Sequence, residues 1–189
     1  MPPGPVSSRS SWLSKTTFED VFHDAGCGVS APQVRLRAAT AADEPLLFAI
    51  YAASRAEEMA LVSWTDEQQL AFITQQHHAQ SSSYRARHPE GEFLIVELLD
   101  GRGIGRLYRA RISGDEVRVL DIALLPEWCG RGIGSALLHD VMAETERGGH
   151  MVSLHVEFWN PAVRLYERLG FVEAGRNDVH VRMEYRATR

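Results

Sequence analysis

The pentapeptide Gly-Arg-Gly-Ile-Gly occurs twice in this chain of 189 residues, at positions 101–105 and again at 130–134. Strand-like segments lie on both sides of the first copy, at 92–99 and 106–113, and this context is typical of a hairpin turn. The second copy follows a strand-like segment at 117–125 and precedes a stretch whose apolar residues recur every three or four positions. The same five residues therefore predict a turn in one place and the start of a helix in the other.

A glycine-rich junction between a strand and a helix is suited to holding an anion. Three glycines in five residues let the backbone curl around a ligand, and the helix contributes unpaired N–H groups and the positive end of its dipole. Arg131 adds a full positive charge, which suits a pyrophosphate better than a single carboxylate. A loop without a ligand is the alternative, and the strand before the loop and the amphipathic helix after it disfavour that alternative. The apolar stripe of that helix consists of Ile133, Ala136, Leu137, Val141 and Met142.

Composition restricts the class of protein further. The chain is 44% hydrophobic, has no apolar run that approaches a membrane span, and lacks a secretory signal at residues 1–14, so we expect a cytoplasmic protein with no membrane partner. The net charge of −5 argues against nonspecific nucleic-acid binding. The two cysteines, Cys27 and Cys129, lie in unlike contexts without metal-ligand spacing, so we expect neither a disulfide nor a metal site.

The chain divides into an extension and one domain. Residues 1–33 begin with three prolines among five residues and continue with serines, which predicts an extension that is partly disordered, with a possible short helix after a capping box of Thr16 and Glu19. Residues 34–189 have the regular pattern of one globular domain. Its expected strands are 34–37, 92–99, 106–113, 117–125, 151–157 and 179–185, and its expected helices are 40–59, 65–80, the stretch after 133, and 161–169.

A second informative segment runs from Asn160 to Phe171. Asn160 suits a helix cap, Pro161 a first helical position, and Gly170 the left-handed residue that ends a helix. Tyr166 falls on the apolar face of this helix, where it is either a core aromatic with its hydroxyl bonded or a functional group.

The strand ending at 121–125, the loop at 126–134 and the block at 160–171 resemble, in order and separation, the coenzyme A binding core of the GNAT N-acetyltransferase superfamily. The resemblance covers residues 34–185. It implies an α/β (α+β) fold with a mixed, mostly antiparallel sheet of six to seven strands, helices on both faces, and a splay between the fourth and fifth strands. It also implies acetyl-CoA as cosubstrate and direct transfer of its acetyl group to a primary amine of a small molecule or peptide.

The same resemblance implies roles for residues at the cofactor. The pyrophosphate would bind the backbone amides from Gly130 to Ser135, with Cys129 at a loop position where the family usually has Arg or Gln. Ile122 and Leu124 would pair their backbone with the pantetheine arm, and the Leu124 N–H would polarise the thioester carbonyl. The cofactor-binding residues would be Ile122, Leu124, Cys129, Gly130, Arg131, Gly132, Ile133, Gly134, Ser135, Asn160 and Tyr166.

The resemblance also implies the groups that move protons. Tyr166 would protonate the leaving thiolate as general acid, and a base must accept a proton from the amine. Asp121 is the first candidate base and Glu157 the second, although either could be a cap or a solvated charge on a strand. His155 alternates with apolar neighbours, which favours a packed or hydrogen-bonded histidine. The acidic segment 38–83 would attract a cationic amine, unless its acids are ordinary solvated helix faces.

Two alternatives from other classes remain at this point. Cys129 in the loop would suit a noncatalytic module that binds coenzyme A, for which the last strand would offer the surface of a homodimer. A nucleotide-binding α/β domain is disfavoured, because the chain has neither a Walker A sequence nor a complete GxGxxG.

Overall fold

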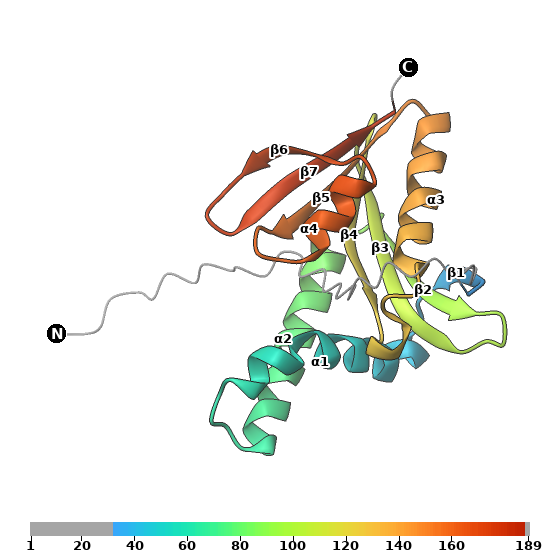
Figure 1. Ribbon diagram of the computed structural model, residues 1–189. Helices are drawn as coiled ribbons and strands as arrows, with labels where there is room; N and C mark the ends of the chain where they lie inside the picture. Colours follow the sequence, from blue (N-terminus) through green and yellow to red (C-terminus); the bar gives the residue numbers. More distant parts are fainter. Residues whose placement is uncertain (1–31, 188–189) are drawn as a thin grey trace.

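A computed structural model describes residues 32–187 and shows a single seven-stranded sheet in the order β1-β2-β3-β4-β5-β7-β6 (Figure 1). The pairing is antiparallel everywhere except between β4 and β5, which are parallel. The strands are β1 (Val34–Ala38), β2 (Glu92–Leu98), β3 (Gly103–Ser113), β4 (Glu116–Leu124), β5 (Met151–Glu157), β6 (Val172–Arg176) and β7 (His180–Arg186). The predictions for Thr16, Glu19 and Cys27 lie outside the described residues.

Helices cover both faces of the sheet, as predicted. They are α1 (Glu44–Ala60), α2 (Asp66–Arg87), α3 (Ile133–Arg147) and α4 (Ala162–Arg168). The helices α1 and α2 pack on one face, where Leu47 and Tyr84 meet Leu120 of β4, and α3 and α4 pack on the other, where Leu137 and Leu165 meet Ile122. Within residues 32–187, no helix combines the length and apolar character needed to cross a bilayer.

The strands β4 and β5 diverge, which confirms the predicted splay. Their register begins at Glu116 opposite Met151 and ends with the fourth pair, Val119 opposite Leu154. Beyond that point β4 continues to Leu124 and β5 to Glu157. An opening between two neighbouring strands is therefore built into the middle of the sheet.

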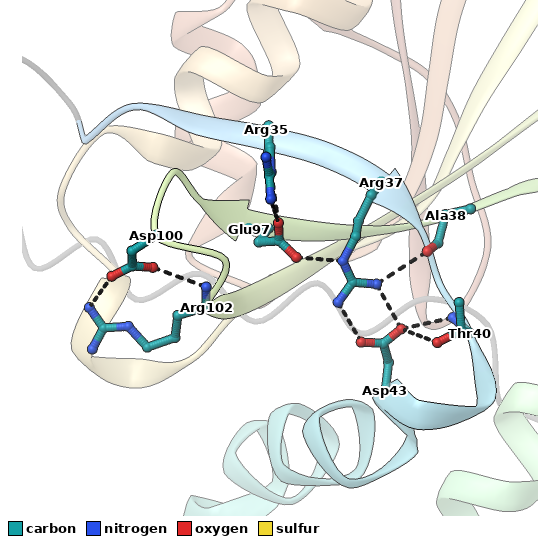
Figure 2. A network of polar contacts seen from close by, with 8 residues as sticks. All are labelled: Arg35, Arg37, Ala38, Thr40, Asp43, Glu97, Asp100 and Arg102. Carbon is teal, nitrogen blue, oxygen red and sulfur yellow. Dashed lines mark hydrogen bonds and ion pairs between the residues drawn. The ribbon is translucent and has the colours of Figure 1, made fainter.

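The first Gly-Arg-Gly-Ile-Gly copy forms a turn, as predicted, but the turn is shorter than expected and β3 begins at Gly103. Gly101 takes the left-handed conformation (φ 91°), and Asp100 Oδ1 accepts the Arg102 N–H at 3.0 Å (Figure 2). Gly105 lies inside β3, where a Cβ would come within 2.5 Å of the Leu124 side chain and 2.6 Å of a carbonyl oxygen on β4. These glycines therefore serve a turn and a close strand contact.

Two other elements differ from the prediction. The helix α2 continues seven residues past the expected end at Gln80, because Tyr84 is buried against the sheet and donates its hydroxyl to the Leu120 carbonyl at 3.2 Å. The strand β6 is absent from the predicted segments. All five of its residues are exposed, so no alternation of burial marks Val172–Arg176 in the sequence.

A polar network joins the edge of the sheet to the start of α1 (Figure 2). Glu97 on β2 accepts hydrogen bonds from both Arg35 and Arg37 on β1. Arg37 also pairs with Asp43, with its Nη2 atom 2.6 Å from Oδ1, and the Thr40 N–H donates to the same carboxylate at 2.8 Å. The Arg37 guanidinium holds the pKa of Asp43 well below its usual range. These contacts connect β1, β2 and α1.

We expect Gly105→Ala to lower the free energy of unfolding by about 1–3 kcal/mol, because the new methyl group would overlap Leu124 and the β4 backbone. Gly114→Ala is the matched control, since a Cβ there would meet nothing within 4 Å. Denaturant unfolding of both variants measures the difference. Equal stability of the two variants would contradict the close contact between β3 and β4.

Candidate functional site

The second Gly-Arg-Gly-Ile-Gly copy forms a tight loop that leads into α3. Gly130 and Gly132 both adopt the left-handed conformation, with φ of 69° and 76°. The first hydrogen bond of the helix runs from the Ala136 N–H to the Gly132 carbonyl at 3.0 Å. The N–H groups of residues 133–135 therefore precede the helical ladder and project from the helix end. They form a row of donors at the positive end of a 15-residue helix.

Cys129 closes the turn that precedes this row. Its N–H donates to the Pro126 carbonyl at 3.1 Å, and its Sγ lies 3.6 Å from the Leu125 carbonyl oxygen and 3.9 Å from that of Leu124. Both groups point back towards the end of β4. Cys129 therefore fills the loop, and its amide contacts protein rather than joining the amides of residues 130–135.

Two guanidinium groups lie on Trp128, next to the loop. Arg131 from the second pentapeptide is 4.8 Å from the centroid of the indole, and Arg102 from the first is 5.5 Å away. The two copies of the pentapeptide are thus neighbours in space. A guanidinium within about 6 Å of an indole is held by cation–π attraction, so both charges are kept beside the row of amides.

The backbone at the end of β4 faces the opening. The Leu125 N–H donates to the Ile104 carbonyl of β3 at 2.8 Å. Because successive peptide groups of an antiparallel strand point to opposite edges, the N–H groups of Leu124 and Ile122 face β5. The divergence of β4 and β5 leaves this edge of β4 outside the shared ladder.

Tyr166 lies on α4, and Asn160 lies in the turn that precedes this helix. Tyr166 is fully buried in the main hydrophobic cluster, with its ring centroid 5.8 Å from that of Phe171. Asn160 Oδ1 accepts the Ala162 N–H at 2.9 Å, and Gly170 ends the helical segment with a φ of 90°. The cap and the left-handed end therefore form where the sequence predicts them, and they fix Tyr166 on α4.

Asp121, the first candidate base, lies in a buried ion pair. Its Oδ2 is 2.7 Å from Arg106 Nη2, and the two side chains are 0% and 3% exposed. Arg106 Nη2 also donates to Gln80 Oε1 at 3.3 Å. Burial raises the pKa of Asp121, and the Arg106 guanidinium opposes that rise. Asp121 is therefore positioned as the counterion of a buried arginine.

A cavity of about 230 Å³ lies on the opposite face of the opening. Its wall combines the end of α2, strands β4 and β5, the turn between β6 and β7, and the first residue of β7. The lining residues are Tyr84, His88, Arg118, Leu120, His155, Asn177 and His180. The candidate bases Asp121 and Glu157 do not belong to the wall that the described residues form.

His155 is the lining residue that the sequence predicts to be a packed or hydrogen-bonded histidine. It is half-buried, and its neighbours Leu154 and Val156 belong to the hydrophobic cluster on the α3 side. The alternation of a strand therefore turns His155 towards the cavity. Burial, together with Arg118 and Arg182, lowers the pKa of His155 and so favours the neutral imidazole. The alternating pattern was visible in the sequence, but the cavity was not.

Comparisons with known proteins identify the family of the chain. The family model of the acetyltransferase (GNAT) domain matches residues 89–173. The chain is 31% identical over 123 residues to [ribosomal protein bS18]-alanine N-acetyltransferase of Haemophilus influenzae, which covers 64% of this chain and 81% of that protein.

Solved structures share the fold. PaiA N-acetyltransferase of Thermoplasma acidophilum, in complex with coenzyme A, has a TM-score of 0.63 at 18% identity, covering 82% of this chain and 99% of that chain. Spermidine N-acetyltransferase of Vibrio cholerae, in complex with coenzyme A and spermine, has a TM-score of 0.55 at 22% identity, covering 82% and 95%.

The chain belongs to the GNAT family of acetyltransferases. It is an acetyl-CoA-dependent N-acetyltransferase, as the family resemblance implied.

We expect Asp121→Asn to lower the free energy of unfolding by about 3–5 kcal/mol, because it leaves Arg106 as a buried charge without its counterion. Asp140→Asn on the exposed side of α3 should change it by less than about 0.5 kcal/mol. Urea titration of both variants provides the comparison. If Asp121→Asn kept full stability and lost only activity, Asp121 would be a base rather than a counterion.

Proposed function

We propose that the opening between β4 and β5 holds the acetyl-pantetheine arm of acetyl-CoA and that the acetyl group passes there directly to a primary amine. The observation that carries this proposal is the early end of the β4–β5 ladder, which leaves the edge of β4 that carries the N–H groups of Ile122 and Leu124 outside that ladder. The arm needs a slot that runs into the sheet, and the reaction needs a donor at the thioester oxygen.

The amides from Gly130 to Ser135, which include the row at residues 133–135, take the pyrophosphate in this proposal. The left-handed residues Gly130 and Gly132 curl the loop around an anion, and the positive end of α3 adds a favourable field. Arg131, held on Trp128, supplies a full charge beside them. Cys129 stabilises the shape of the loop, since its N–H donates a hydrogen bond to the Pro126 carbonyl.

Leu124 and Asn160 position the reacting group. The Leu124 N–H would donate to the thioester oxygen and stabilise the negative charge that develops there as the amine attacks. Ile122 extends the same backbone edge along the pantetheine. Asn160 uses its side-chain oxygen as a helix cap, so it would meet the pantetheine through its amide group.

Tyr166 acts as the general acid. Its hydroxyl would donate a proton to the thiolate that leaves, which prevents the reverse attack of the sulfur on the new amide. The complete burial of its ring among α4, β5 and Phe171 gives the side chain one position. Asp121 supports the site as the counterion of Arg106.

The acceptor enters from the cavity on the α2 side. The relative from Haemophilus influenzae is named for an alanine of a ribosomal protein, and the one from Vibrio cholerae for spermidine. We infer a primary amine of a peptide or small molecule for this chain. A panel that contains a peptide with N-terminal alanine, spermidine and free amino acids would identify the class.

We expect Tyr166→Phe to lower kcat by about 100-fold or more while the Kd for acetyl-CoA changes little, because only the proton donor is lost. A thiol-release assay and calorimetric titration measure the two quantities. Full activity in this variant would show that another group protonates the thiolate. Acetyl-CoA binding by the unmodified protein, without thiol release on any amine of the panel, would favour a noncatalytic module instead.

A further inference from the structure

We propose that His155 is the catalytic base that accepts the proton of the attacking amine. The inference rests on the proposed function, because it assigns the proton acceptor of the same reaction. It differs from both sequence candidates, Asp121 and Glu157.

The register of the sheet places His155 at the start of the opening. The last β4–β5 pair joins Val119 to Leu154, and His155 is the next residue along β5. On β4 the next residue is Leu120, which lies at the register shift between β3 and β4. Both His155 and Leu120 line the cavity. The imidazole therefore stands at the point where the two strands part.

His155 and Tyr166 lie on opposite faces of the sheet. Leu154 and Val156 share a hydrophobic cluster with Tyr166, whereas the cavity reached by His155 includes Tyr84 of α2. An amine that enters through the cavity would approach the carbonyl from one side of the opening. The thiolate would leave towards Tyr166 on the other side, so acid and base would not compete for one position.

The charges around His155 favour its neutral form. Burial lowers its pKa most, and Arg118 of β4 and Arg182 and His180 of β7 lower it further. Glu116 acts in the opposite direction, but it is already shared between Arg118 at 2.6 Å and Arg182 at 3.4 Å. Tyr84 of α2 and His88, which follows the end of α2, also line the cavity. A neutral imidazole has the lone pair that a base needs.

The proposed reaction moves two protons, one from the amine and one to the leaving thiolate. The amine nitrogen forms a bond to the carbonyl carbon, the carbon–sulfur bond breaks, and the thiolate takes the Tyr166 proton. The amine proton passes to a ring nitrogen of His155, directly or through one water molecule. Exchange with solvent then removes the proton from His155 and restores that of Tyr166. The products are the acetamide and coenzyme A with its thiol.

Other groups near the opening fit this role less well. Asp121 forms an ion pair with Arg106 and lies outside the cavity wall that residues 32–187 form. Three histidines line the cavity, and of these only His155 lies on a strand that borders the opening. His88 follows the end of α2, and His180 belongs to β7.

We expect His155→Gln to lower kcat/KM by about 100-fold at pH 7 with an unchanged Kd for acetyl-CoA. The activity of the unmodified enzyme should fall as the pH drops through the pKa of His155, below 6.5, because the protonated ring cannot accept a proton. That acidic limb should disappear in the variant, whose remaining rate should follow deprotonation of the amine itself. His139→Gln on the exposed side of α3 is the control and should keep both the rate and the limb.

NMR titration of the His155 ring in the unmodified protein provides a second test that needs no variant. Agreement between its pKa and the kinetic limb supports the assignment, and a clear mismatch overturns it. An unchanged pH profile in His155→Gln, or a loss of acetyl-CoA binding or folding that explains the lost rate, would also overturn it. An unmodified protein that binds acetyl-CoA but acetylates no amine would reject the proposed function, and the assignment of His155 with it.

Discussion

The hydrogen bonds between β4 and β5 end after four residue pairs, and the arrangement of the site follows from that early end. The continuing part of β4 presents backbone N–H groups to the opening, and its last residues lead into the glycine loop and α3. Tyr166 approaches from one face and His155 from the other. A sheet with a complete ladder at this place would bury the same amides in hydrogen bonds and separate the two side chains.

A register shift between β3 and β4 lies next to the buried ion pair of Arg106 and Asp121. The shift falls between Tyr108 and Arg109 on β3, so Asp121 lies opposite Tyr108 and contacts Arg106 on the same face of the sheet. A buried ion pair contributes little net stability over an apolar pair of the same size, but losing one partner is costly. The pair therefore makes this local geometry sensitive to substitution. The Arg106 guanidinium also contacts Gln80 of α2, so the pair lies between α2 and the sheet.

Much of the fold was predictable because its signals are local. The glycine loop, the cap at Asn160 and the left-handed Gly170 depend on residues close in sequence, and the structure contains all three. The strand β6 gave no signal, because an exposed edge strand lacks alternation. The partner of Asp121 and the cavity beside His155 depend on which strands are neighbours and in what register. Those relations join residues far apart in the chain, so one sequence could not reveal them.

Amide hydrogen exchange with and without coenzyme A tests the central claim most directly, and the repeated pentapeptide provides its own control. We predict that coenzyme A slows exchange in peptides covering Ile122–Leu124 and Gly130–Ser135, where the backbone faces the opening or precedes the helix. Exchange at the first copy, residues 101–105, should stay the same. Equal effects at both copies, or no protection at residues 130–135 under saturating coenzyme A, would contradict the account.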